Sequence, residues 1–165
     1  MYDIYHPDQN NLWRYTLGRS GSNPLLVIGL NPSTATPEKL DPTVTRVAKV
    51  AQQCGFDGFV MLNLYPVRAT KPNDLPPKAD PIAYERNLEE IEKVVAQYPS
   101  PTIWATWGES VVNRPYLLQA RDALHKRLQS HTPQWRRFGD LTASGHPRHA
   151  SRLSYAWTLE PYELA

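Results

Sequence analysis

The sequence contains a single cysteine, Cys54, and no apolar run of the length that a membrane-spanning helix requires. One cysteine cannot form an internal disulfide or a cysteine-based zinc site. A helix that crosses a bilayer needs about 20 consecutive apolar residues. The first fifteen residues, MYDIYHPDQNNLWRY, also lack the basic and then apolar stretches of a signal peptide. We therefore expect a soluble, cytoplasmic protein that does not associate with membranes.

Several common catalytic and cofactor-binding motifs are missing. The sequence has no Gly-x-Gly-x-x-Gly fingerprint, no P-loop and no Gly-x-Ser-x-Gly elbow, which argues against dinucleotide binding, P-loop chemistry and an α/β-hydrolase. Asp41 and Asp80 each precede a proline and are explained as helix caps, so a two-carboxylate hydrolase is not indicated. His146 and His149 could bind a metal, but no acidic or cysteine ligand clusters with them. We therefore expect neither a metal nor a cofactor.

What the chain does contain is a folded core and an unusual number of prolines. With 165 residues, of which 41% are hydrophobic, it suits one α/β domain over residues 1–165. Sixteen prolines are nearly a tenth of the chain, against a typical share of about 5%. They are scattered singly between hydrophobic runs, which indicates shaped loops between structural elements. Disorder is therefore not expected.

Charge is unevenly distributed along the chain. The formal net charge is only +2, but residues 114–152 hold eight basic and two acidic side chains, and the remainder holds ten basic and fourteen acidic ones. Four of the five histidines lie in the same basic segment. Such a segment is compatible with phosphate contacts. A solvated helix face followed by a basic loop would produce the same pattern.

Strand and helix patterns alternate. Apolar stretches predict strands over 25–30, 59–64, 102–108 and, more weakly, 135–141. Helices are expected to begin at Pro42, Pro81 and Pro115, and the first of them to end at Gly55. The repeat of about 30 residues is the size of a βαβ unit. We therefore predict a three-layer α/β/α fold with a small, four-stranded, mainly parallel sheet, against which the aromatic tail from Ser151 packs.

Polar residues follow the predicted strands, and ligands bind at the carboxyl ends of parallel strands. We therefore expect one crevice lined by four loops. The candidates are Asn31, Pro32, Ser33 and Thr34 after the first strand, Asn63, Tyr65 and Arg68 at the second, Trp107, Gly108, Glu109 and Ser110 after the third, and His146, Arg148 and His149 after the fourth.

Some of these side chains suggest particular roles. Asn63 ends an apolar strand, where an amide could read a planar nucleobase edge or cap a neighbouring loop. Asn31 could orient a water molecule or cap the following turn. His146 and His149 suit acid–base or phosphate contacts, and Arg148 is a phosphate ligand candidate.

Together, the segments GLNPST, DPTVTR, VMLNLYPVRAT, the Trp-Gly pair and GHPRH resemble the bacterial domain of unknown function 1643. The resemblance extends from Leu12 to His149. At the superfamily level the same positions are similar to uracil-DNA glycosylases. The matching features are a Gly-x-Asn-Pro motif at Gly29–Pro32, an apolar strand that ends in Asn63, the pair Trp107-Gly108 and the pair His146-Pro147.

The glycosylase resemblance implies a uracil-DNA glycosylase-like fold and hydrolysis of an N-glycosidic bond in modified or deaminated DNA. Asn31 would position water, Asn63 would bind the base edge, His146 would stabilise charge on the departing base and Tyr65 could stack on it. Arg148, with the basic segment, would hold phosphates. Two alternatives are an enzyme of free nucleotides or nucleosides and a non-catalytic nucleic-acid-binding module. Each would make a nucleic acid or nucleotide the partner.

Overall fold

The computed structural model describes residues 2–164. Three α-helices and seven strands are found in this range, in the order β1 (Ile4–Pro7), β2 (Arg14–Arg19), β3 (Leu25–Gly29), α1 (Pro42–Gln53), β4 (Phe59–Asn63), α2 (Pro81–Val95), β5 (Thr102–Ala105), α3 (Pro115–Leu128), β6 (Gln134–Phe138) and β7 (Leu159–Pro161). The 3₁₀ turns in the same range are η1 (Pro72–Asp74), η2 (Glu109–Asn113), η3 (Gln129–His131) and η4 (Ala150–Arg152). No helix among these combines the length and the apolar character needed to cross a membrane.

All seven strands belong to one sheet, in the order β1-β2-β4-β3-β5-β6-β7. The four predicted strands form its parallel centre, β4-β3-β5-β6. The prediction of a four-stranded sheet was wrong at both edges, because β1 and β2 extend one side and β7 extends the other, all in antiparallel pairing.

The edge strands escaped prediction because they are short and carry mixed side chains. β1 and β7 have four and three residues, and every one of them is at least partly exposed. β2 begins with Arg14 and contains Gly18, which weakens any apolar pattern. Such strands depend on pairing with distant partners, as Leu17 of β2 does with Met61 of β4.

The three helices begin where the Asp-Pro and Pro signals predict. Asp41 accepts a hydrogen bond from the backbone N–H of Val44 at 2.9 Å and caps α1. Asp80 caps α2 by accepting from the N–H groups of Ile82 and Ala83. α3 starts at Pro115 without a side-chain cap. The caps satisfy backbone donors that a helix leaves unpaired at its first turn.

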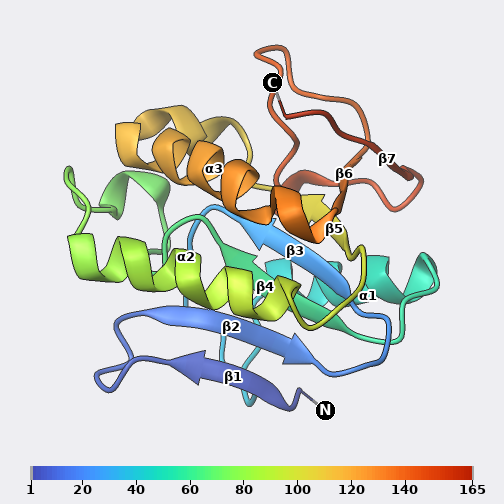
Figure 1. Ribbon diagram of the computed structural model, residues 1–165, viewed down its shortest axis with the longest axis horizontal. Helices are drawn as coiled ribbons and strands as arrows, with labels where there is room; N and C mark the ends of the chain where they lie inside the picture. Colours follow the sequence, from blue (N-terminus) through green and yellow to red (C-terminus); the bar gives the residue numbers. More distant parts are fainter. Residues whose placement is uncertain (1, 165) are drawn as a thin grey trace.

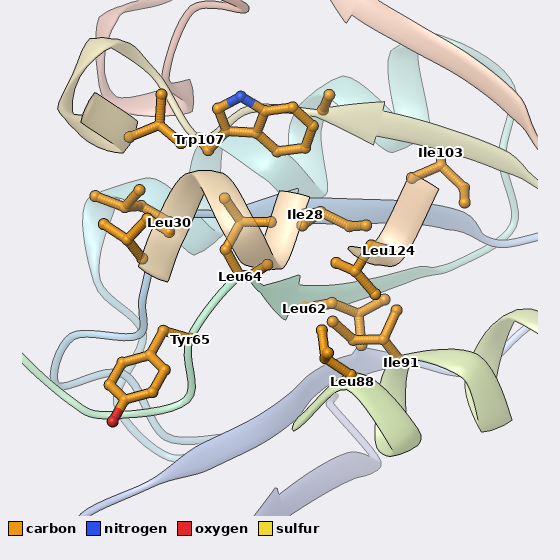
Figure 2. Close-up of a cluster of buried hydrophobic side chains, with 14 of the residues drawn as sticks. Ile28, Leu30, Leu62, Leu64, Tyr65, Leu88, Ile91, Ile103, Trp107 and Leu124 are labelled. Carbon is orange, nitrogen blue, oxygen red and sulfur yellow. The ribbon is translucent and has the colours of Figure 1, made fainter. Parts of the chain in front are cut away.

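The helices lie on both faces of the sheet, which confirms the three-layer arrangement. α2 and α3 lie side by side on one face and α1 lies on the other (Figure 1). Side chains of β3, β4, β5, α2 and α3 meet in the first layer, among them Leu62, Leu88 and Leu124 (Figure 2). The second layer packs α1 against the sheet through residues such as Val47 and Val27. Successive residues of β3 and β4 therefore alternate between two buried layers.

The chain order creates a crevice between β3 and β5. After β3 the chain passes through α1 to β4, and after β5 it passes through α3 to β6, on the opposite side of the sheet. The loops that follow these adjacent strands thus diverge to opposite faces. This is a topological switch point, where open α/β sheets bind their ligands.

Candidate functional site

A cleft of about 980 Å³ opens at this switch point. Its walls come from the loops after β3 and β5, the first turn of α1, the start of β2 and the loop that leads into η4. This volume is at the upper end of the range for small-molecule sites. Segments that are far apart in the sequence therefore meet around one cavity.

The structure brings together nine of the fourteen predicted site residues around the cleft. Six of these nine are Asn31, Pro32, Ser33, Trp107, Arg148 and His149. Gly108, Glu109 and Ser110, which were also expected at the third strand end, line it too. Predicted residues from three of the four strand ends therefore line the cleft, and the second strand contributes Met61 and the loop residues Ala69 and Thr70 instead.

Five predicted residues lie outside the lining: Thr34, Asn63, Tyr65, Arg68 and His146. Thr34 is exposed to solvent beyond the β3 loop. Tyr65 is buried in the layer of α2 and α3, where it packs on Tyr116 and its hydroxyl accepts from the Asp80 N–H at 2.7 Å. His146 closes a tight turn through the hydrogen bond from its N–H to Thr142 Oγ1.

Arg68 is occupied by the protein itself. Its guanidinium donates to the carbonyl oxygens of Ser33 and Ala35, at 2.7 and 3.1 Å, and to the Tyr5 hydroxyl at 2.7 Å. A further pair of bonds reaches Asn11. Arg68 therefore fixes the β3 loop to the N-terminal strands, and this structural role explains why it does not line the cleft.

Asn63 lies beside the cleft without lining it. It is fully buried at the end of β4, and neither side-chain amide atom has a hydrogen-bond partner among residues 2–164. A Cβ placed on Gly29 would lie 2.9 Å from the methyl of Met61 and 3.1 Å from the Asn63 Oδ1. Met61 does line the cleft. A buried, unpaired amide costs about 1–3 kcal/mol. The amide of Asn63 lies next to Met61, which separates it from the cleft.

The amide of Asn31 is oriented by the backbone around it. Its Nδ2 donates to the carbonyl oxygens of Pro32, at 3.0 Å, and Ala69, at 2.9 Å. Both amide hydrogens are thereby used, and Oδ1 remains as a hydrogen-bond acceptor. Asn31 can therefore accept a hydrogen bond from a ligand or from a water molecule in the cleft.

His149, rather than His146, is the histidine of the cleft. Its Nδ1 accepts a hydrogen bond from the Ser151 N–H at 3.1 Å, so the neutral ring must carry its proton on Nε2. Burial lowers the pKa of His149 below its usual value, and the nearby charge of Arg152 adds to the effect, against the opposing influence of Asp41. The ring is therefore a neutral Nε2–H donor at pH 7.

The loop that carries His149 is fixed over the end of β5. Thr106 Oγ1 donates to the Arg148 carbonyl oxygen at 2.8 Å, and Arg148 Nε donates to the Asp140 carbonyl at 2.9 Å. Gly108 has φ +75°, and a Cβ at this position would lie 3.0 Å from the His149 Cβ. The glycine thus permits both the backbone turn after β5 and the close approach of the His149 loop.

Arg14 enters the cleft because of an irregularity in the sheet. Leu17 of β2 belongs to the layer on the α1 side, so strict alternation would place Arg14 on the opposite face. The β1–β2 pairing shifts between His6 and Pro7, which oppose Thr16 and Arg14, so Tyr15 is an extra residue. A β-bulge of this kind redirects the next side chain, and it places Arg14 among the residues that line the cleft.

The cleft as a whole is cationic. Arg14, Arg46, Arg148 and Arg152 line it together with two carboxylates, Asp41 and Glu109. Hydrogen bonds from Thr142 and Ser144 and the proximity of His146 lower the pKa of Glu109, so this rim carboxylate is ionised at pH 7. Asp41 is engaged in capping α1. The arginines leave a net positive charge that suits an anionic ligand.

Sequence reasoning missed four lining residues in particular: Arg14, Arg46, Met61 and Arg152. Arg46 and Met61 could have been found from periodicity, since they lie one turn after the α1 cap and two residues before Asn63. Arg14 had no such signal, because its position depends on the bulge.

Elsewhere, a smaller hollow of about 420 Å³ over the β1–β2 hairpin contains none of the predicted site residues.

No group of three or more His, Cys, Asp or Glu side chains that could hold a metal ion occurs within residues 2–164. The polar groups of the cleft are an amide, a neutral imidazole, guanidinium groups, several hydroxyls and the two carboxylates of Asp41 and Glu109. This donor set suits hydrogen bonding and anion binding.

Comparison with known proteins identifies the family of this chain. The family model described as "Protein of unknown function (DUF1643)" matches residues 14–150. No curated protein and no solved structure matches the chain. The matched range includes every residue that lines the cleft except Ser151 and Arg152. Because the match covers far more than half of the sequence, the chain belongs to the DUF1643 family.

Proposed function

We propose that the cleft binds a nucleotide, either free or as part of a nucleic acid. One observation carries this proposal: apolar and cationic side chains line the same cavity. We call the buried apolar residues Leu30, Met61 and Trp107 the floor. The wall consists of the four arginines, next to the first turn of α1.

Each part of a nucleotide has a suitable counterpart there. The apolar floor can accept the face of a base, and Asn31 Oδ1 and His149 Nε2–H supply one acceptor and one donor for base or sugar edges. Guanidinium groups bind phosphate oxygens through charge-assisted hydrogen bonds, and a helix N-terminus favours an anion nearby. The resemblance of the Gly29–Pro32 and Trp107-Gly108 motifs to uracil-DNA glycosylases supports the same ligand class.

Binding can be tested by calorimetric titration with nucleosides, nucleoside monophosphates and short single- and double-stranded DNA. We expect a nucleoside monophosphate to bind, and Arg46→Gln to weaken binding about tenfold. Lys126→Gln is the matched control, because it removes one positive charge from an exposed site on α3, outside the cleft. Binding to DNA, if it occurs, will weaken steeply with salt. Failure of every nucleoside, nucleotide and DNA to bind would exclude the proposal.

The fixed amide of Asn31 favours a second candidate, hydrolysis of an N-glycosidic bond. A water molecule that donates to Asn31 Oδ1 would attack C1′ of the sugar as the C1′–N bond breaks, while His149 Nε2–H donates a hydrogen bond to the departing base and stabilises its developing charge. The proton that the water loses passes to the departing base, because the Asn31 amide cannot accept it. In this proposal His149 takes the role that the resemblance gave to His146. Asn63 would read the base edge only after Met61 moves aside, because Asn63 itself does not line the cleft.

The hydrolysis proposal predicts free base as a product. Chromatography of reactions with modified nucleosides and with DNA that contains deaminated bases measures this directly. Asn31→Ala should abolish base release, while nucleotide binding persists through the arginines. If the unmutated protein releases no base from any substrate, the hydrolysis proposal fails and the binding proposal is unaffected.

A further inference from the structure

Arg14 is an unusual side chain for the interior of a protein. It is only 2% exposed, yet its guanidinium makes a single hydrogen bond within residues 2–164, from one terminal nitrogen to the Ala35 carbonyl at 3.3 Å. Its Nε is buried and has no partner among residues 2–164. Buried arginines are normally paired, because an uncompensated charge in the interior is strongly unfavourable.

No carboxylate of the described residues is close enough to form a salt bridge with Arg14. The charged groups that influence Arg14 are Arg68, of like sign, and Asp41, whose carboxylate caps α1. Burial and the proximity of Arg68 lower the pKa of Arg14 to about 10, which still leaves the group charged at pH 7. The protein therefore keeps an incompletely paired cation at the inner wall of an open cleft.

The position of Arg14 limits the shape of a ligand that could pair with its guanidinium. The side chain projects from a bulge in β2, donates to the Ala35 carbonyl of the β3 loop and is almost fully buried in the wall of a cleft that the first turn of α1 also lines. A terminal phosphate can reach a cation at the inner end of a cleft. An internal phosphodiester would need space for the nucleic acid chain to leave on both sides of the phosphate.

We propose that Arg14 is the anchor for a terminal phosphate group, so that the ligand is a phosphomonoester such as a nucleoside monophosphate rather than an internal nucleotide of a polymer. This inference rests on the proposed nucleotide binding and specifies its ligand class. The terminal guanidinium nitrogen that does not bond the Ala35 carbonyl would donate to a phosphate oxygen in a charge-assisted hydrogen bond, because Nε is enclosed by protein atoms. Arg46 and Arg152 would supply further positive charge nearer the opening.

The first test compares four probes on the full chain by calorimetry: inorganic phosphate, a nucleoside 5′-monophosphate, the same nucleoside, and a dinucleoside monophosphate, whose single phosphate is a diester. We expect the monophosphate to bind at least about tenfold more tightly than the nucleoside or the diester. Arg14→Gln should abolish that advantage, and Lys126→Gln should preserve it. Equal affinities for monophosphate and diester, or an unchanged advantage in Arg14→Gln, would overturn the proposal.

A second measurement does not require the variant to fold. In the unmutated protein, the guanidinium N–H resonances of Arg14 should shift when inorganic phosphate is added, and they should not shift with the nucleoside. Guanidinium signals of Arg14 that are all unchanged by saturating phosphate would overturn the proposal on their own.

The outcomes also separate this inference from the one on which it rests. If the nucleoside binds but the phosphate adds no affinity, the cleft is a nucleoside site and the role of Arg14 is refuted. If phosphate binds through Arg14 but the nucleoside moiety adds nothing, the anion anchor stands and nucleotide recognition is refuted.

Discussion

At the scale of the residue, Gly108 is a position of the site where both the backbone conformation and the space for a side chain are restricted. Its φ of +75° and ψ of −175° lie in a region that only glycine adopts readily, and a Cβ would meet the His149 Cβ at 3.0 Å. We expect Gly108→Ala to destabilise the fold by about 1–3 kcal/mol and to displace the His149 loop, with loss of ligand binding. Urea unfolding and calorimetric titration measure the two effects.

Gly55 offers the matched control. It also has a positive φ, of +86°, but a Cβ at this position would have no atom within 4 Å. Gly55→Ala should therefore lower stability through backbone strain and leave ligand affinity unchanged. If both variants bind ligand as well as the unmutated protein, the close packing of Gly108 against His149 has no part in the site.

His149 gives the stability of the protein a defined pH dependence. Because burial lowers its pKa in the folded state, the unfolded chain binds a proton at a higher pH than the folded one. The contribution of the neutral ring to the free energy of unfolding is fully present above the pKa of the unfolded chain, about 6.5. It declines as the pH falls toward the lower pKa of His149 in the folded state. His149→Gln should flatten this part of the profile, measured by urea unfolding between pH 5 and 8. An identical slope in the variant would show that other groups cause the dependence.

At the scale of the element, the Asp-Pro signals show how directly local chemistry sets a helix boundary. Asp80 accepts from two backbone N–H groups at the start of α2 and lies outside the cleft. We expect Asp80→Ala to cost about 1 kcal/mol of stability without changing ligand affinity. Asp74→Ala, at an exposed aspartate in η1, is the control for loss of charge alone. Equal stability of the two variants would contradict the capping role.

The same local signals explain which elements could be predicted. The helices and the central strands carry caps, prolines or continuous apolar runs within their own residues. β1, β2 and β7 carry little of this, and they exist because of antiparallel pairing with neighbours that lie elsewhere in the chain. The bulge at Tyr15 is still harder to predict from the sequence, because it depends on how β1 and β2 align. Arg14 could not be assigned to the cleft without it.

At the scale of the whole molecule, the candidate site was predictable to the extent that sheet topology determines it. Carboxyl ends of adjacent parallel strands meet at one edge, so Asn31 and Trp107 could be placed together from sequence. Asn63 satisfies the same rule at the end of its strand, yet it lies outside the lining, beside Met61. The choice between His146 and His149 depended on a five-residue turn whose geometry the sequence does not reveal.

The distribution of the cleft walls has a consequence for the order of folding. Arg14 lies near one end of the chain and Arg152 near the other, while α1 and the β5 loop come from between them. Closing loops of this length costs more entropy than forming local contacts, so we expect these contacts to form after the local ones. A ligand that contacts segments from both ends of the chain and from between them therefore recognises only the completed fold and stabilises it by mass action. Ligand binding during refolding would thus report the last assembly step of the molecule, after the βαβ units have formed.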